Sequence, residues 1–252
     1  TKNGDGTMIL SGANTYTGAT TINAGTLALR GGSAIIDTAT VQLANASGVV
    51  LSVLGNETIG SLQGGGTTGG EVNIASGQTF TVVETGSQTF AGSIAGFGSF
   101  TKSGSGTLAL SGTNTHAGGT TLNSGTLVAQ NASAMGVGVV ALNGGRLVAE
   151  MSLNLAALNW ADGDIRLAPA AGTVLHITGG LNNAGSGGAF AIDSTNLVPG
   201  SYTLATFGST DFKVVDFSAT FLNLDPSVHF QSQFLLNAGH LQFQLLGLSL
   251  IH

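Results

Sequence analysis

Hydrophobic and polar residues alternate along most of the chain in short runs. In the segment 106–112, Leu108 and Leu110 point to one side of an extended strand, and the residues between them point to the other side. The same period of two recurs at 39–44, 48–55, 71–77, 78–84, 138–150, 164–169 and 173–181. Gly, Asn and Ser separate these runs. The pattern predicts many short β-strands and no helix, since even the best helical window, 151–160, fits another pair of strands.

One stretch of the chain is written twice. Residues 1–30 and 101–130 align without a gap and share seventeen identities in thirty positions. A sequence that is repeated in this way is typical of a repeated structural unit. The candidate structural residues of this repeat are Gly12, Asn14, Thr15, Tyr16, Gly18, Asn23 and Gly25 in the first copy, and Gly112, Asn114, Thr115, His116, Gly118, Asn123 and Gly125 in the second.

The turn chemistry distinguishes between the folds that short strands allow, which are a sandwich, a propeller or a β-solenoid. Hairpins favour Asn-Gly or Asp-Gly pairs, and these occur only at residues 3–4, 5–6, 143–144 and 162–163. Most other breaks are single Gly residues or Asn, Ser and Thr clusters, which suit the corners of a continuing coil. We therefore predict an all-β, right-handed parallel β-helix. Coils of about 20–25 residues would give about ten to twelve coils and a rod of roughly 50 Å.

The composition changes after residue 200. Seven of the twelve Phe residues lie there, and Gly becomes rarer. We predict a β-helix over 1–200, and wider final coils or a C-terminal cap over 201–252. Such a cap is needed because an uncovered last coil exposes both its core and its unpaired backbone.

Charge and cysteine content exclude several classes of function. Only 7% of residues are charged, the net charge is −6, and there is no basic run or cysteine. This composition disfavours nucleic-acid binding and excludes disulfides and thiolate metal sites. No apolar run approaches the ~18 residues of a membrane-spanning helix, so we do not expect the chain to span a membrane. Lys2 and Lys102 recur beside Gly turns, where we expect solvated surface cations that discourage edge pairing.

The best enzymatic candidate is the segment 161–167, which brings Asp162, Asp164 and Arg166 close together. Two carboxylates are too few for a strong Ca²⁺ site, which takes six to eight oxygen ligands. We therefore expect a turn with a solvated ion pair, and no catalytic residue, metal site or cofactor. The histidines are scattered without metal-ligand spacing, at positions 116, 176, 229, 240 and 252.

The repeated polar residues also have two interpretations. The recurring Asn residues can hold coil corners through backbone bonds or amide ladders, or they can line a glycan site. Tyr16 can cover a turn or stack on a sugar. In both cases we favour the structural role.

The segment 96–127, GFGSFTKSGSGTLALSGTNTHAGGTTLNSGTL, resembles the autotransporter-associated β-strand repeat, also called the passenger-associated transport repeat. Residues 2–27 are similar to a second copy. The resemblance implies a β-helical passenger region that is secreted or displayed on the surface of Gram-negative bacteria after export across the outer membrane. His116 departs from the Tyr that the family has at this position.

Two classes of function follow. The first is a non-enzymatic extracellular structural protein, such as a surface stalk, an adhesin passenger or a subunit of a head-to-tail fibre. In a fibre, the apolar segment 240–252 of one copy would stack on the N-terminal coil of the next, whereas in a longer passenger neighbouring coils would supply those contacts. The alternative is a β-helix that binds or degrades polysaccharides, with surface glycans as its ligands.

Overall fold

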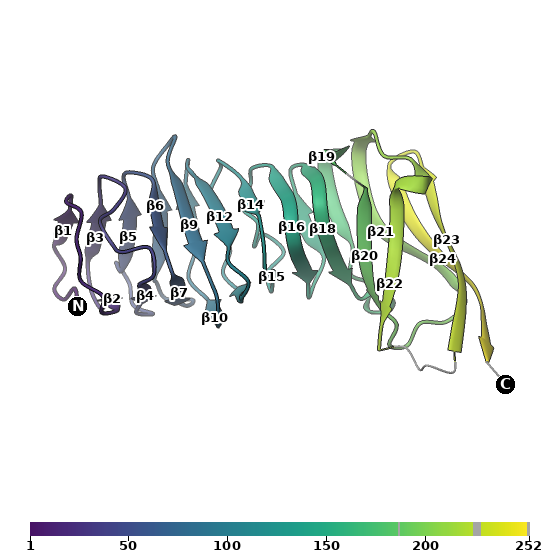
Figure 1. The fold of residues 1–252 in the computed structure, drawn as a ribbon, viewed down its shortest axis with the longest axis horizontal. Helices are drawn as coiled ribbons and strands as arrows, with labels where there is room; N and C mark the ends of the chain where they lie inside the picture. The colour runs from purple at the N-terminus through teal and green to yellow at the C-terminus, as the bar shows by residue number, and fades with distance from the viewer. Residues whose placement is uncertain (186, 224–227, 251–252) are drawn as a thin grey trace.

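The protein is an elongated β-solenoid of about nine turns (Figure 1). This computed structural model describes residues 1–185, 187–223 and 228–250. The strands are β1 (Thr7–Leu10), β2 (Thr20–Ile22), β3 (Thr26–Leu29), β4 (Thr40–Leu43), β5 (Val50–Val53), β6 (Glu57–Ile59), β7 (Ser61–Gly64), β8 (Glu71–Ile74), β9 (Thr79–Val83), β10 (Ser87–Phe90), β11 (Ile94–Gly96), β12 (Ser99–Ser103), β13 (Thr107–Leu110), β14 (Thr120–Leu122), β15 (Thr126–Ala129), β16 (Val140–Ala149), β17 (Leu153–Leu155), β18 (Leu158–Leu167), β19 (Leu175–Asn183), β20 (Gly188–Asp193), β21 (Gly200–Thr210), β22 (Phe217–Leu222), β23 (Val228–Asn237) and β24 (His240–Leu250). Among the described residues, the only helical elements are two 3₁₀ turns, η1 (Pro169–Ala171) and η2 (Val214–Asp216). The all-β prediction is confirmed.

The two copies of the repeated phrase form equivalent coils. In the first, β1 pairs in parallel with β3 and sets Thr7 opposite Thr26. In the second, β13 pairs in parallel with β15 and sets Thr107 opposite Thr126. No antiparallel pair occurs through 100–130, which is fully described, so the predicted solenoid coils are confirmed.

The core consists of inward-facing residues that stack from coil to coil. In one row, Leu27 lies opposite Leu51, Leu51 opposite Val72, and Val72 opposite Ile94. All four side chains are buried. Each such burial contributes about 1.5–3 kcal/mol. The period of two therefore becomes a continuous apolar column, because coils repeat at the spacing of paired strands.

The solenoid has fewer turns than the ten to twelve that coils of 20–25 residues predict. Coils near the middle repeat after 20 residues, as between Asn123 and Asn143. Towards the C-terminus the separation grows to 30 residues, as between His176 and Thr206. Strands β23 and β24 then leave the path of the coils. The same length of chain therefore makes fewer turns.

The C-terminal region closes the solenoid with an antiparallel hairpin (Figure 1). Strand β21 pairs in parallel with β19 on one edge and antiparallel with β24 on the other. Strands β23 and β24 pair antiparallel around Gly239, whose φ of 78° suits the tight turn. The placement of a boundary at residue 200 stays a prediction, because β21 begins at Gly200 and still continues the parallel stack.

Several Phe residues of this region pack into an aromatic cluster with Phe190 and Trp160. Phe190, Phe212, Phe217 and Phe234 pack around one another with ring centroids 4.9–6.1 Å apart, and Trp160 packs edge-on against Phe190. Such pairs add about 0.5–1.5 kcal/mol each beyond area burial.

The stacking of segment 240–252 on another copy stays a prediction. Leu241, Phe243 and Leu245 of β24 are buried within their own chain. Residues 251–252 lie outside the described residues. Across the described chain, no helix is long and apolar enough to cross a membrane.

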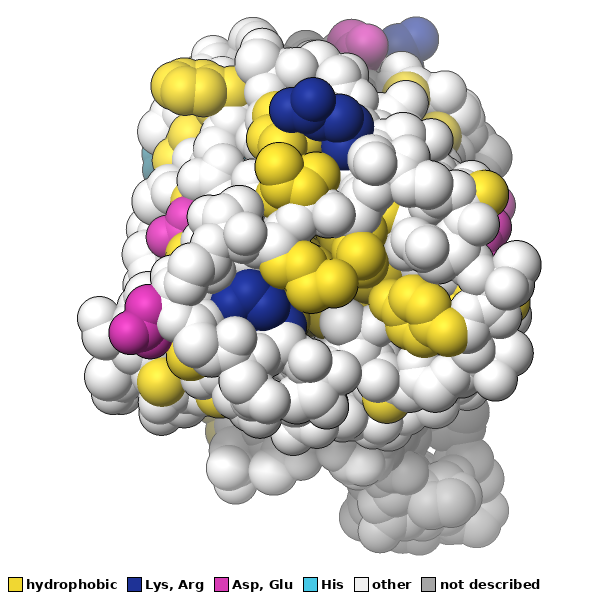
Figure 2. Space-filling model, turned by 90° about the vertical axis from the view of Figure 1, so that its left-hand side faces the viewer, with side chains coloured by type: hydrophobic (Ala, Val, Ile, Leu, Met, Phe, Trp, Pro, Cys, Tyr) yellow, Lys and Arg dark blue, Asp and Glu magenta, His cyan; other side chains and the backbone are white. Residues whose placement is uncertain are grey.

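At the N-terminal end, β1 is the edge strand of its sheet. Met8 and Ile9 are 47% and 55% exposed, whereas their counterparts Leu108 and Ala109 are 0% and 8% exposed under the coil that contains β10. Hydrophobic side chains gather on this end of the molecule, with few charged groups between them (Figure 2).

Candidate functional site

The two repeated lysines are buried, and the expectation of solvated surface cations is wrong. The Lys102 side chain is fully buried and its Nζ donates to the carbonyl oxygens of Ser103, Gly104 and Ser124. The Lys2 Nζ donates in the same way to the carbonyls of residues 3, 4 and 24. Each ammonium thus holds together two successive turns, because its three protons match three backbone carbonyls that come from both turns.

Burial lowers the pKa of Lys102 to about 8, and the nearby Glu84 carboxylate opposes this shift. Glu84 is itself buried and accepts hydrogen bonds from the Ser61 hydroxyl and the Gly86 backbone N–H. Sequence reasoning missed Glu84, since a lone acid at a strand end gave no signal that it lies under a turn.

Glu57 is a second buried acid that the sequence did not reveal. Its carboxylate accepts hydrogen bonds from the backbone N–H groups of Ala34 and Ile35, 22–23 residues away in the chain. Burial raises the pKa of Glu57, the two backbone hydrogen bonds oppose that rise, and the charge of Asp37 adds to it. Glu57 therefore fixes a loop of the preceding coil to β6.

The Asn pair at the loop after the first strand holds neighbouring coils together. Asn114 is buried, accepts from the Ile94 N–H at 2.8 Å, and donates to the Ala134 carbonyl at 2.6 Å. Asn14 donates to the Ala34 carbonyl in the equivalent way. Thr115, which is exposed beside it, donates its backbone N–H to the Ile94 carbonyl. Thr15 is likewise exposed.

The second recurring Asn pair forms short amide ladders on the surface. Asn23 donates to the Asn3 side chain at 2.9 Å, and Asn143 donates to Asn123 at 3.1 Å. Asn123 also donates to the Ser103 hydroxyl. These contacts are of the kind expected for the corner role, which the sequence favours over a glycan site.

Glycines are required at the corners for two reasons. Gly25 and Gly125 have φ angles of 65° and 72°, and a Cβ at Gly125 would overlap the carbonyl oxygens of Gly104 and Gly106. Gly112 and Gly118 have ordinary φ angles, but a Cβ at either would overlap the backbone of the preceding coil. Their counterparts Gly12 and Gly18 have nothing within 4 Å of such a Cβ.

Tyr16 and His116 make the same contact with a Thr four residues later. The Tyr16 hydroxyl lies 2.8 Å from Thr20 Oγ1, and His116 Nε2 lies 2.8 Å from Thr120 Oγ1. The Thr120 hydroxyl donates its only proton to the Met135 carbonyl, so it accepts from Nε2–H of His116.

This arrangement has an energetic cost at the other ring nitrogen of His116. With the proton on Nε2, Nδ1 carries a lone pair that is buried without a hydrogen-bond partner in the structure. Burial lowers the pKa of His116, and a hydrogen bond with the Ile94 backbone opposes the shift. Tyr16, at the equivalent position, has no ring nitrogen that could be buried without a partner. The retained Thr at position 120 was the signal in the sequence that could have revealed this pair.

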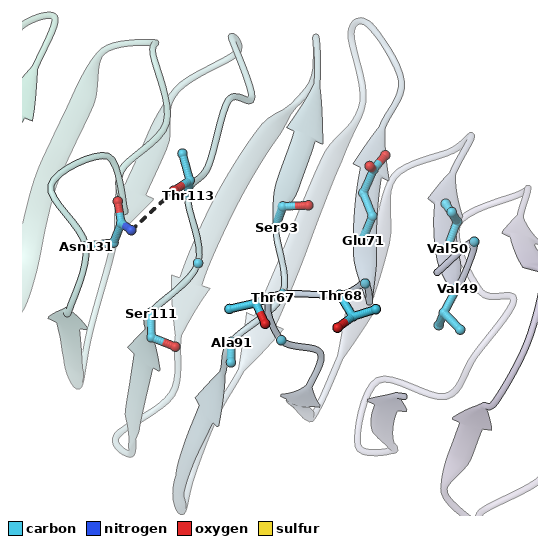
Figure 3. Close-up of a pocket in the computed structure, with 15 residues that line it drawn as sticks. Val49, Val50, Thr67, Thr68, Glu71, Ala91, Ser93, Ser111, Thr113 and Asn131 are labelled. Atoms are coloured by element: carbon cyan, nitrogen blue, oxygen red, sulfur yellow. Dashed lines mark hydrogen bonds between the residues drawn. The ribbon is translucent and has the colours of Figure 1, made fainter. Parts of the chain in front are cut away.

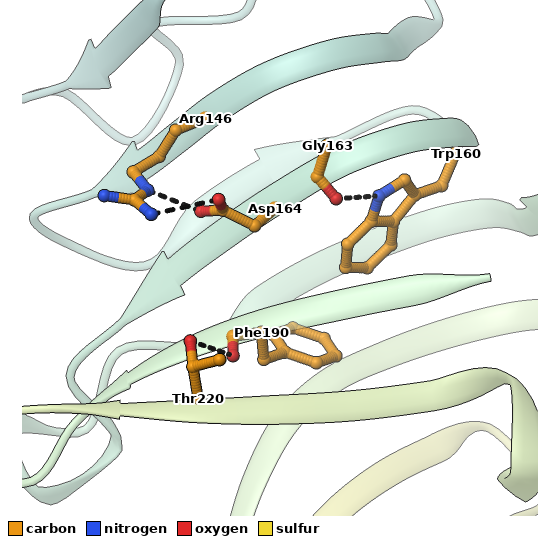
Figure 4. Close-up of polar contacts among 6 residues, drawn as sticks. All are labelled: Arg146, Trp160, Gly163, Asp164, Phe190 and Thr220. Carbon is orange, nitrogen blue, oxygen red and sulfur yellow. Dashed lines mark hydrogen bonds and ion pairs between the residues drawn. The ribbon is translucent and has the colours of Figure 1, made fainter. Parts of the chain in front are cut away.

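The predicted turn at 161–167 is wrong, because the segment lies in the long strand β18. The side chains of Asp164 and Arg166 each form an ion pair with a residue of another coil. Asp164 accepts two hydrogen bonds from the Arg146 guanidinium (Figure 4). Arg166 binds Asp193 at 3.0 Å. Asp162 accepts from the Gly163 N–H. Arg166 with Thr195 and Asn223 lowers the pKa of Asp193 to about 2, and the Thr195 hydrogen bond is the largest cause.

The histidines do not gather into one cluster of ligands. Within the described residues, no group of three or more His, Cys, Asp or Glu side chains could hold a metal ion. The His229 side chain and all of His252 lie outside the described part. His176 and His240 are exposed and both border one cavity at the C-terminal end.

A lateral groove of about 610 Å³ crosses several coils (Figure 3). The segments 48–50, 66–69, 91–93 and 111–113 line it, together with Glu71 and Asn131. Asn131 donates to the Thr113 hydroxyl at 3.2 Å, and Glu71 accepts from Asn73. The lining is rich in glycine and hydroxyl groups, and Glu71 is its one acidic residue among the described lining residues.

The chemistry of the groove suits binding better than bond cleavage. Glycoside hydrolysis normally uses two carboxylates, one as acid and one as base or nucleophile. Glu71 has no second carboxylate within the described lining. Hydroxyls, backbone groups and a carboxylate can exchange hydrogen bonds with an extended ligand that carries many hydroxyls.

Comparison with known proteins identifies the repeated unit. The family model of the passenger-associated transport repeat matches residues 1–29 and 100–129, so the chain contains two such repeats and the resemblance drawn from the sequence is confirmed. A curated relative, the adhesin BmaC autotransporter of Brucella suis biovar 1 (strain 1330), is 38% identical over 101 residues. That alignment covers 39% of this chain and 3% of the relative, so the chain spans a small fraction of that protein's length.

Proposed function

We propose that this chain, built on two passenger-associated transport repeats, is part of the exported, surface-displayed passenger of an autotransporter adhesin. In this role it is a non-enzymatic stalk that works by reach and persistence. The observation that carries the proposal is the equivalence of the two repeats as stacked coils, with Thr7–Thr26 and Thr107–Thr126 in the same register. The relative's printed name, an adhesin autotransporter, supports it.

The physical basis of this function is a rod that offers a protease few accessible cleavage sites. Parallel coils pair backbone groups along the axis, and each added coil extends the rod by about 4.8 Å. The chain has only six Lys and Arg residues. Lys2 and Lys102 are buried, while Arg146 and Arg166 are ion-paired.

Adhesion is tested with beads that carry the chain 1–252, counted on host-type epithelial cells. The control is Gly125→Ala, which strains a left-handed corner and destabilises the second repeat. We expect wild-type beads to bind at least several-fold more than control beads and to resist trypsin for longer. Equal binding by both kinds of bead would refute the adhesin role.

The non-enzymatic part has its own test. The chain is incubated with pectin, alginate and other polyuronates, with and without Ca²⁺, and product formation is measured. We expect no turnover. Cleavage that disappears in Asp162→Ala or Asp164→Ala would show that the carboxylates of β18 are catalytic.

The exposed edge strand β1 at the N-terminal end supports a fibre as one form of this structural function. Met8 and Ile9 of the edge strand β1 are exposed apolar residues, and unpaired strand edges pair with other strands. Hydrophobic side chains gather on this end of the molecule (Figure 2). In light scattering after size exclusion, a fibre subunit grows with concentration and Met8→Lys abolishes growth. Val137→Lys, at an exposed lateral position, serves as the control. A chain that stays monomeric at every concentration excludes the fibre and leaves the stalk.

Polysaccharide binding is the second candidate, and the lateral groove is the observation that favours it. Thr113→Trp would fill the groove, whereas Thr89→Trp changes an exposed residue of β10 outside it. On a glycan array, binding that Thr113→Trp removes and Thr89→Trp retains supports this function. Binding that both variants retain places the glycan elsewhere.

A further inference from the structure

Two histidines flank a threonine where the last parallel coils meet the C-terminal hairpin. The register sets His176 of β19 opposite Thr206 of β21, and Thr206 opposite His240 of β24. The three residues therefore form one row across three adjacent strands. All three border one open cavity of about 400 Å³, so their side chains share a face of the sheet.

The spacing of this row suits a shared metal ion. Adjacent strands lie about 4.8 Å apart, which places the Cα atoms of His176 and His240 about 10 Å from each other. A Zn²⁺ ion 2.0–2.1 Å from an imidazole nitrogen lies about 6 Å from the Cα of that histidine. Two such arms that meet at a tetrahedral angle span about 10 Å, which is the separation the row provides.

The hydrogen bonds of the two rings leave the right nitrogens available. His240 Nδ1 lies 3.2 Å from the Ala238 carbonyl oxygen, which can only accept, so the proton is on Nδ1 and the lone pair is on Nε2. His176 Nδ1 lies 3.3 Å from Thr206 Oγ1, which turns that ring towards the threonine between the two histidines. Metal-binding histidines usually anchor the non-ligating nitrogen in this way.

We propose that His176 and His240 bind one divalent transition-metal ion, Zn²⁺ or a metal of similar preference, through their Nε2 atoms. Water completes the coordination, because within the described residues no third His, Cys, Asp or Glu joins the pair. Imidazole donors select such ions over Ca²⁺ and Mg²⁺, which prefer oxygen ligands.

The metal would clamp the hairpin onto the solenoid. Strand β24 is hydrogen-bonded to the parallel stack through its antiparallel pairing with β21, and its Phe243 packs against Phe221 of β22. A bridge from His240 to His176 adds a connection that skips over β21 to β19. Because this site exists only in the folded chain, the ion stabilises the fold by mass action.

The test is a titration of ZnCl₂ into metal-free chain 1–252, followed by calorimetry and by the thermal midpoint. We expect one ion per chain with micromolar affinity and a midpoint that rises by several degrees. His176→Asn and His240→Asn should each weaken binding at least tenfold and remove the rise, and the double variant should be no worse than either one. Thr206→Val, between the ligands, should retain most of the affinity.

Co²⁺ provides an independent readout, since its visible spectrum reports tetrahedral nitrogen and oxygen ligands. The bands should appear with wild type and vanish in both histidine variants. Circular dichroism checks folding, which these exposed substitutions should not change. Absence of binding at millimolar Zn²⁺, or unchanged affinity in either single variant, would overturn the proposal.

Discussion

Replacing Lys102 with Met removes the buried ammonium while it keeps the apolar stem. Three hydrogen bonds from Nζ to the carbonyls of Ser103, Gly104 and Ser124 are lost. At about 1.5 kcal/mol for each bond to a charged donor, their loss costs roughly 4–5 kcal/mol. The variant also avoids the cost of burying a charge. A pKa lowered from 10.5 to about 8 sets that cost on the order of 3 kcal/mol. We expect a net decrease of about 1–2 kcal/mol in the free energy of unfolding at pH 7.

The pH profile identifies the ammonium as the cause. The pKa of Lys102 is about 8 in the folded chain and 10.5 when unfolded, so the unfolded state holds more protons between these values. The free energy of unfolding of the wild type therefore gains a contribution that grows from pH 8 to pH 10.5. Lys102→Met lacks this group, and its deficit should widen over that window.

Urea denaturation followed by far-UV circular dichroism measures both effects. Lys213→Met, at an exposed position, is the matched control and should change stability by less than about 0.5 kcal/mol. A Lys102→Met variant as stable as wild type at pH 7 would refute the role of the carbonyl cage. A deficit that narrows above pH 8 would contradict the lowered pKa of Lys102.

Three further substitutions test the corners and the surface. His116→Tyr introduces the residue that the first copy has at this position. The wild type should lose stability as the pH falls below about 6.5, because His116 becomes protonated in the unfolded state while burial keeps its pKa lower in the folded state. Urea titrations at acid pH should show this dependence for the wild type and not for the variant. Gly125→Ala places a Cβ at a residue with a φ of 72° and makes it overlap the Gly104 carbonyl oxygen. Thermal melts should show that the free energy of unfolding decreases by about 3 kcal/mol or more. Unchanged stability would contradict the close packing of the corner. Arg146→Ala breaks a pair whose side chains are 42% and 29% exposed, so urea melts should show a loss of at most about 1 kcal/mol that salt reduces, whereas a large loss would mean that the pair is more than a surface contact.

The sequence by itself determined the course of the chain through the solenoid. Alternation at Leu108 and Leu110 set which side chains enter the core, and the copied phrase set the register of Thr7 with Thr26 and Thr107 with Thr126. The scarcity of hairpin dipeptides correctly favoured coil corners over antiparallel turns. These properties are local, because a strand period and a corner glycine act within a few residues of themselves.

Only the tertiary structure decided which polar groups meet. Residues two apart in a strand lie about 6–7 Å apart, whereas successive coils lie about 4.8 Å apart, so a side chain's nearest polar partner is usually one coil away. For this reason Asp164 pairs with Arg146 rather than Arg166, and Lys102 completes its cage with the carbonyl of Ser124, 22 residues further along. Coil lengths vary from 18 to 30 residues, and this variation fixes which pairs form while leaving the alternation unchanged.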